Sequence, residues 1–564
     1  MTALHTAPGR VDDPGARDVA SRAPRPPVPV ERVVASLVLL ALAVAAVWAL
    51  LWIRLDVGRM LLSWSNAERF IRRIGAIQFP APAELAYQTA LTVGLVVCGT
   101  ALAAVLSVPV AFLAAANTTP NPLVRTVARF VGVLARALPD VVLAMVFVLV
   151  FSLGTLPGIL AIGLHSVGMI SKMFADAIEQ IDEGPRLAIR AAGGSRLQEY
   201  TAGVLPQVLP SWVATTLHRN DINLRGSVLL GYVGVAGLGM QMSYAFKALD
   251  YGLGLGYALV IFALCVVMEF ISSGVRAAML GASSGRPARR PRSRPQTVPS
   301  DVERALRRPW TRARTRNTGW GWAAVAVLAA SVWVCDIAWG DIVTVWGRIP
   351  PVAAQFWPPD VGAYSPGRMM GAMGETIAIA LAATLLSLAF SLVIGSLAAR
   401  NVAPNPAVRG GARVLLVLIR AIPEIILAIV LIVITGLGAQ AGTIALAFGG
   451  IGLLGKLIAD SLEEVDPGPE HALTATGASR GQVYAGATVP QGLRAVIGHT
   501  FYMLDTNLRA ATTLGIVGAG GVGYYLLNAS QGANYGLVTT IVGMILAAVL
   551  VVESLAMWMR HTFR

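Results

Sequence analysis

The chain has 564 residues, of which 55% are hydrophobic and only 13% charged, and its formal net charge is +14. A soluble globular chain carries about 25% charged residues, so this composition excludes an ordinary soluble domain. The apolar residues fall in long blocks, which predicts an all-α polytopic membrane protein.

A polar N-terminal tail, residues 1–32, precedes the first apolar block, Val33–Ile53. This block has no charge over about 20 positions, the length that crosses a hydrocarbon core of roughly 30 Å. No small-residue cleavage site follows it, so we expect an uncleaved span and not a signal peptide. The next segment is predicted to be either an interfacial amphipathic helix, which nearby tryptophans favour, or a positive surface for an external partner or anion. It carries Arg54, Arg59, Arg69, Arg72 and Arg73, with Trp48, Trp52 and Trp64 around it.

Further apolar blocks follow in chain order: Leu85–Ala116, Val141–Ile170, Val208–Val233, Leu253–Ile271, Trp322–Ala338, Thr376–Ala398, Ile425–Leu454, Leu493–Val517 and Val538–Val552. The Gly and Pro residues of Gly154–Pro157 favour a break inside the second of these blocks. With that break, and its equivalent later in the chain, each half of the sequence is predicted to contain about six transmembrane helices.

The second half of the chain repeats the first half at a constant offset of 284 residues. Asn117 has its counterpart at Asn401, Lys172 at Lys456, and "RALPD" at Arg136–Asp140 becomes "RAIPE" at Arg420–Glu424. The offset does not drift, which indicates a duplicated domain. We expect a first membrane domain at 33–276 and a second at 317–564.

The positive charge is concentrated between the two halves. Residues 276–316 contain twelve Arg against Asp301 and Glu303. This run, 277–316, is predicted to be a disordered linker on the cytoplasmic side, because Lys and Arg are retained inside. The same rule predicts cytoplasmic N- and C-termini. No nucleic-acid partner is expected, because aromatic residues do not interleave with the charges. The cysteines Cys98, Cys265 and Cys335 lie in apolar blocks and are expected to be small hydrophobic residues.

One charged, Gly-punctuated segment occurs twice. The first polar segment is "IDEGPRLAIRAAGGSRLQEYTAGVLPQ", Ile181–Gln207, and the second is "VDPGPEHALTATGASRGQVYAGATVPQ", Val465–Gln491. Pro185 suits a first helical turn, Gly193 a helix stop and Ser195 an N-cap. The sequence therefore predicts a helix, a turn and a second helix on the cytoplasmic side, as a docking element for a partner.

The spacing of these segments resembles the cytoplasmic loop of binding-protein-dependent ABC importer permeases. Gly193 precedes Leu205-Pro206, and Gly477 precedes Val489-Pro490, at the family's interval. The leading Glu of that motif is replaced by Leu187 and His471. The chain is more closely similar to the phosphonate importer permeases, which share the acidic-x-Asn-x-Arg run at Asp221–Arg225 and Asp505–Arg509. A Gly-rich run follows each copy, Gly231–Gly239 and Gly515–Gly523.

The resemblance implies that this fused chain supplies both type I-like permease domains of an ABC importer for phosphonate, phosphate or phosphite in the bacterial inner membrane. It implies three partners: two cytosolic ABC ATPase subunits, which bind ATP and Mg²⁺, and an external phosphonate- or phosphate-binding protein. The residues expected in the ATPase-coupling loops are Glu179, Asp182, Ala188, Gly193, Ser195, Pro206, Glu463, Asp466, Ala472, Gly477, Ser479 and Pro490.

Ionisable residues also occur inside the predicted spans. Asp221 and Arg225 lie four residues apart on one helical face, and Asp505 and Arg509 repeat them. Such charges either neutralise each other and fix helix packing or mark a transport route. Glu269 and Glu553 are expected to be structural. The residues predicted for a pathway or gate are Asp221, Asn223, Arg225, Asp505, Asn507, Arg509, Asp140, Glu424, Gly520 and Gly521.

No covalent chemistry is expected of the chain itself. Gly450–Lys456 satisfies the spacing G-x4-G-K, but Leu457 replaces the Ser or Thr that binds Mg²⁺, and the surroundings are an apolar span. No His/Cys cluster suggests a metal site. The leading alternative function is a secondary transporter with parallel six-helix repeats, which would need an ion relay.

Overall fold

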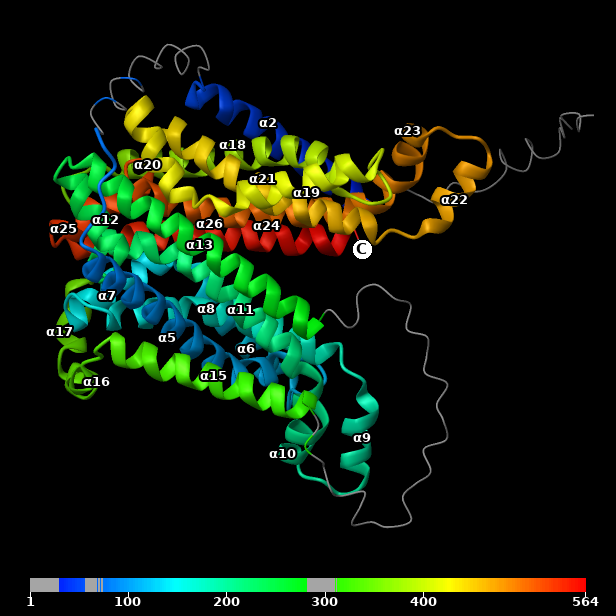
Figure 1. The fold of residues 1–564 in the computed structure, drawn as a ribbon. Coiled ribbons are helices and arrows are strands. Elements are labelled where there is room, and N and C mark those ends of the chain that lie inside the picture. Colours follow the sequence, from blue (N-terminus) through cyan, green and yellow to red (C-terminus); the bar gives the residue numbers. More distant parts are fainter. Residues whose placement is uncertain are drawn as a thin grey trace, which may run out of the picture.

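Figure 1 shows the computed structural model, which describes residues 30–55, 75–280 and 312–563, together with Glu68, Arg72 and Trp310. These residues form helices and turns, with one isolated bridge between Gly154 and Val235. The first half comprises α2 (Val30–Ile53), α5 (Pro82–Ala114), α6 (Pro122–Ala137), α7 (Asp140–Phe151), α8 (Leu156–Glu179), α9 (Glu183–Ala191), α10 (Arg196–Gln198), η1 (Glu199–Val204), α11 (Leu205–Leu230), η2 (Gly231–Val233), α12 (Leu238–Lys247) and α13 (Tyr251–Leu280).

The second half repeats this order. It comprises α15 (Arg312–Val334), α16 (Trp339–Thr344), η3 (Val345–Gly347), α17 (Ile349–Gln355), α18 (Pro366–Ala398), α19 (Pro406–Ala421), α20 (Glu424–Thr435), α21 (Ala439–Glu463), α22 (Pro467–Ala475), α23 (Arg480–Val483), η4 (Tyr484–Thr488), α24 (Val489–Ile516), α25 (Val522–Gln531) and α26 (Tyr535–Thr562). Within the described residues the all-helical expectation is confirmed.

Seven of these helices are long and apolar enough to cross a membrane. Three bent pairs pass the same test together, among them α6 with α7, bent by 83°, and α19 with α20, bent by 75°. The helices α11 and α24 have 26 and 28 residues but carry the charged runs. Counted with them, each half has six long elements, in agreement with the predicted number. The helix α6 is amphipathic and precedes the bend at which α7 begins.

The first long helix of each half packs against the other half. The helix α2 lies along α18, and α15 lies along α5, as Figure 1 shows at the two outer sides of the bundle. The two domains expected from the repeat, 33–276 and 317–564, therefore exchange their first helices. The first helix of each domain packs against the other domain. One apolar core runs through both halves and includes Leu95, Val228, Ile379 and Leu514.

Two ends of the bundle differ in character. Figure 1 places α9, α10, α22 and α23 at one end and α12, α25, α16 and α17 at the other. The polar segments thus occupy the same end in both halves, as the repeat predicts. A smaller apolar cluster lies beneath each of them, around Phe174 and Trp212 in the first half and around Leu416 and Ile458 in the second.

Several expected segments lie partly outside the described residues. The helix α13 reaches Leu280 and α15 begins at Arg312, so both ends of the expected 277–316 linker are helical. Residues 281–309 and most of the tail 1–32 lie outside the described residues. So do Arg59, Arg69 and Arg73 of the arginine-rich segment, whereas Arg72 forms an exposed pair with Glu68 at 2.7 Å.

Candidate functional site: two polar segments and the charged seam

Each polar segment begins with a capped helix. The Asp182 side chain accepts a hydrogen bond from the Gly184 amide at 2.9 Å, and Asp466 accepts one from Gly468 at 2.9 Å. These bonds satisfy amides that the first helical turn cannot pair within the helix. The first helix predicted in each segment is confirmed, as α9 and α22.

The turn after that helix has the geometry that its glycine predicts. Gly193 has φ +81° and Gly477 has φ +82°, in the left-handed region where a Cβ is unfavourable. Ser195 and Ser479 then cap the following helix, and in each case the glutamine three residues later completes a capping box.

The second helix predicted in each segment is also confirmed, beginning after Ser195 and Ser479. It continues into the next long helix through a π-helical turn, Glu199–Val204 in the first copy and Tyr484–Thr488 in the second. Pro206 and Pro490 lie in the first turn of α11 and α24, where a missing amide hydrogen is tolerated. The second helix of each polar segment is therefore a continuous extension of the long helix that follows it.

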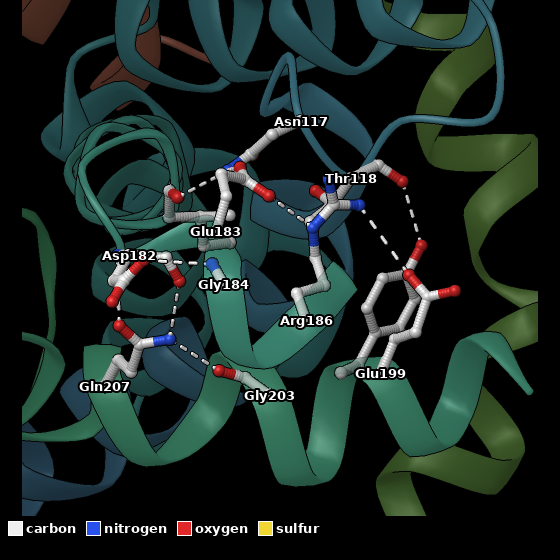
Figure 2. A network of polar contacts seen from close by, with 11 residues as sticks. Asn117, Thr118, Asp182, Glu183, Gly184, Arg186, Glu199, Gly203 and Gln207 are labelled. Atoms are coloured by element: carbon white, nitrogen blue, oxygen red, sulfur yellow. Dashed lines mark hydrogen bonds and ion pairs between the residues drawn. The ribbon is translucent and has the colours of Figure 1, made fainter. Parts of the chain in front are cut away.

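In the first polar segment one arginine holds the two helices together. Arg186 donates to Glu183 at 2.6 Å and lies 3.6 Å from Glu199, as Figure 2 shows. Asn117, from the loop after α5, donates to Glu183 at 2.7 Å. The Glu199 side chain is only 8% exposed, so the guanidinium compensates a carboxylate that has lost most of its water.

A glutamine fastens the start of the first segment to its end. Gln207 donates to the carbonyls of Asp182 and Gly203 and accepts from the Asp182 amide (Figure 2). In the second copy Gln491 donates to Asp466 and Ala487. The short hairpin of helices is thus closed by side-chain bonds and not by an apolar core of its own.

Glu179 and Glu463 anchor the polar segments to the neighbouring loop. Glu179 accepts from the Ala116 amide at 2.7 Å and from Arg129 at 2.9 Å. Glu463 repeats both contacts with Arg400 and Arg413. These two predicted residues therefore support the segments.

The outer surface is formed by α9 and α22, which have no buried residue. Ala188 and Ala472, the predicted coupling positions, are both exposed on these helices. The first copy also exposes Leu187 and Leu197, where the second has His471 and Gly481. Small and apolar exposed groups on a rigid helix suit insertion into a groove of a partner.

The second region is the interface between the halves, which we call the seam. On α11, Asp221 and Arg225 pair at 3.0 Å, and on α24 Asp505 and Arg509 pair at 2.6 Å. Asp221 is 1% exposed. The predicted i,i+4 pairing is confirmed, and both pairs are largely buried.

The seam pairs extend to the opposite half. Arg420, on α19, lies 2.8 Å from Glu269 on α13, which also binds Arg225 at 3.1 Å. In the second copy Arg136, on α6, binds Glu553 on α26 at 2.5 Å. Glu269 and Glu553, which were expected to be structural, join the two halves. Four arginines and four carboxylates form this seam network, which has no net charge.

Arg225 on α11 and Arg509 on α24 also cap helix ends across the seam. Arg509 donates to the Arg136 carbonyl at 2.8 Å, and Arg225 donates to the Arg420 carbonyl. Arg136 and Arg420 stand in the last turns of α6 and α19, where carbonyl groups lack partners within the helix. Each bend between α6 and α7, or α19 and α20, is therefore stabilised by a cation from the other half.

The predicted asparagines do not reach the seam. Asn223 donates to Thr100 on α5, and Asn507 donates to Thr384 on α18, both at 2.9 Å. They hold the fifth long helix of each half to the second, which is a packing role. Asp140 and Glu424 begin α7 and α20 just beyond the bends. Asp140 lies against Gly226, one residue from Arg225, but neither carboxylate has an ion pair among the described residues.

The Gly-rich runs form tight turns at the end opposite the polar segments. A Cβ on Gly523 would lie 1.9 Å from the Thr512 carbonyl oxygen, and one on Gly239 would lie 2.5 Å from the Val228 oxygen. Gly520 and Gly521 have φ +83° and +74°. Close backbone packing and a break between helices thus occur together in these runs.

The G-x4-G-K run is helical throughout, within α21. Its amide groups bond along the helix and cannot cradle a phosphate. Over the described part of the chain, no group of three or more His, Cys, Asp or Glu residues could hold a metal. A cavity of about 660 Å³ lies between α2 and α18, lined by Trp52 and Glu375, and it contains none of the predicted site residues.

Comparisons with known proteins agree with this architecture. Residues 107–279 and 391–563 each match the family described as "Binding-protein-dependent transport system inner membrane component", at the same offset of 284 residues. The chain is 39% identical over 508 residues to the "Phosphate-import permease protein PhnE" of Mycolicibacterium smegmatis, with 88% of each chain covered. It is 40% identical over 185 residues to the "Phosphite transport system permease protein PtxC" of Stutzerimonas stutzeri, over 33% of this chain and 67% of that protein. This multi-pass membrane protein therefore belongs to the binding-protein-dependent transport permeases and carries two copies of their domain in one chain.

Proposed function

We propose that the chain is the membrane-spanning permease of an ATP-driven importer for a phosphorus oxyanion: phosphonate, phosphate or phosphite. The printed names of the relatives support this substrate class. The observation that carries the proposal is the pair of exposed helical segments at one end of the bundle, one from each half. Two equivalent segments at the same end of the bundle suit two copies of one soluble ATPase subunit.

The polar segments and both termini lie on the cytoplasmic side in this proposal. Two cytosolic ATPase subunits, which bind ATP and Mg²⁺, each receive one segment, and an external binding protein delivers substrate at the opposite end. Because α11 and α24 continue out of the segments without interruption, displacement of a segment moves Arg225 or Arg509 directly. The seam network then parts and opens a route that Asp140, Glu424, Gly520 and Gly521 border.

The docking role is tested by Ala188→Trp and Ala472→Trp in the chain co-expressed with its candidate ATPase. Both alanines are exposed, so the larger side chain blocks a groove without disturbing the fold. We expect loss of ATPase co-purification for the double variant and partial loss for each single variant. Ala354→Trp, on the exposed α17 at the other end, is the matched control and keeps the ATPase.

Unchanged co-purification of the double variant would contradict docking through these segments. Uptake into vesicles distinguishes the alternative function. An importer requires ATP and the binding protein, whereas a secondary transporter works with an ion gradient alone.

A further inference from the structure

One polar cluster in the first half has no counterpart in the second. His165 and Ser166 on α8 and Arg219 on α11 correspond, at the offset of 284 residues, to Gly449, Gly450 and Met503. The duplication keeps every member of the seam network yet replaces these three by residues without charge or hydrogen-bonding side chains. This difference indicates a role that the bundle needs once and not twice.

The cluster is held in a fixed arrangement. Arg219 Nε donates to Ser166 Oγ at 3.1 Å, and that hydroxyl donates to Asn223 Oδ1 at 3.0 Å. His165 Nδ1 lies 2.9 Å from the Leu138 carbonyl, between α6 and α7. A carbonyl can only accept, so Nδ1 carries the hydrogen and Nε2 of the neutral ring remains an acceptor.

Arg219 differs from the four arginines of the seam network. Each of those binds a carboxylate, whereas no ion pair within the described residues includes Arg219, and its bond to Ser166 uses Nε alone. Its electrostatic neighbours are Asp140 in its own half and Tyr502 and Arg509 on α24 across the seam. Arg219 is partly buried as a residue, and its terminal nitrogens are not among the fully buried side-chain atoms that lack a partner. Those nitrogens are therefore open to an anion at the seam.

We propose that Arg219, Ser166 and His165 form a transient binding subsite for a monoprotonated phosphorus oxyanion on the transport route. This proposal rests on the proposed function and deepens it. A planar guanidinium offers paired donors that match two phosphoryl oxygens, and Nε2 of His165 accepts from a P–OH group. A single such site, with apolar Met503 at the equivalent position of the second half, binds the anion weakly enough for onward release.

The test uses the permease assembled with its ATPase and binding protein in proteoliposomes, with inorganic phosphate and methylphosphonate as probes. Arg219→Met gives the first half the residue of the second. We expect its uptake to fall roughly tenfold or more, the loss of one charge-assisted contact, while basal ATP hydrolysis and assembly remain normal. Arg219→Lys keeps the charge but not the fork and retains intermediate uptake. Arg494→Met removes an exposed arginine from α24 and is the control with normal uptake.

Normal uptake by an assembled Arg219→Met chain would overturn the subsite. If that variant fails to assemble, Arg219→Lys and His165→Gly decide, and normal uptake by both would equally overturn it. A wild-type complex that neither takes up the probes nor hydrolyses ATP faster with loaded binding protein would instead refute the proposed function. The two failures are therefore distinguishable.

Discussion

The two copies of the seam network contain the same residue types but pair them differently. In one, Glu269 lies between Arg225 and Arg420, and Asp221 lies 3.0 Å and 3.7 Å from the same two arginines, which closes a cluster of four. In the other, Arg509 binds Asp505 while Arg136 binds Glu553, and among the described contacts a backbone carbonyl joins the two pairs. Both copies therefore keep the same residue types at the interface, but the ion pairs that these residues form differ.

The largest predicted effect tests this difference directly. Glu269→Gln removes the charge shared by two guanidinium groups that are 16% and 19% exposed, and Asp221 alone then remains beside them. Because a mostly buried charge that loses its partner is costly, we expect the free energy of unfolding to fall by about 3 kcal/mol. Thermal unfolding of the purified chain in lipid nanodiscs measures the change.

Glu553→Gln is the matched comparison, since Glu553 binds one arginine among the described residues. We expect a clearly smaller fall in the melting temperature than for Glu269→Gln. Equal shifts in melting temperature would show that the two copies form equivalent ion pairs in the membrane. The cluster of four residues around Glu269 would then add no stability beyond that of separate pairs.

A second prediction concerns the Gly-rich turns, where the two halves differ in how closely the backbone of two helices packs. Gly523→Ala would place a Cβ 1.9 Å from a carbonyl oxygen, closer than the 2.5 Å at Gly239, so its overpacking is more severe. We expect Gly523→Ala to lower the free energy of unfolding by about 2 kcal/mol and Gly239→Ala by less. Gly543→Ala, on α26 with nothing within 4 Å, is the control and is neutral or stabilising. A reversed order, measured by the same unfolding assay, would contradict the comparison.

Much of this architecture follows from local sequence. Block lengths predict the long helices, Gly193 and Ser195 predict the turn of the polar segment, and the four-residue spacing of Asp221 and Arg225 predicts their pairing. In each case the interacting groups lie within one or two helical turns. Sequence spacing is then sufficient, because the helix itself fixes which side chains meet.

The contacts across the seam could not be predicted in this way. Arg136 and Glu553 are 417 residues apart, and Arg420 meets Glu269 because the halves face each other, not because of any spacing in either half. The repeat identifies equivalent residues but does not say which of them touch. Arg219 did leave a signal in the sequence, since a polar residue in one copy stands opposite Met503 in the other. A search for such mismatches would have found it.

The smallest predicted effect compares the polar segments. Arg186 compensates the buried Glu199 in the first, whereas Glu470 and Val483 occupy the equivalent positions in the second. Arg186→Ala leaves Glu199 with its charge uncompensated, and we expect the free energy of unfolding to fall by about 1 kcal/mol. Glu199→Val supplies the apolar residue of the second copy, so the double variant Arg186→Ala, Glu199→Val regains part of that loss.

A double-mutant cycle on these two positions isolates their coupling from the separate bond of Arg186 to Glu183. Strict additivity of the two single changes would show that the 3.6 Å contact contributes nothing measurable. A positive coupling shows instead that the first segment depends on an ion pair, whereas in the second Glu470 accepts hydrogen bonds from Asn401 and Thr488. The two polar segments would then respond differently to salt, because screening weakens the ion pair of the first.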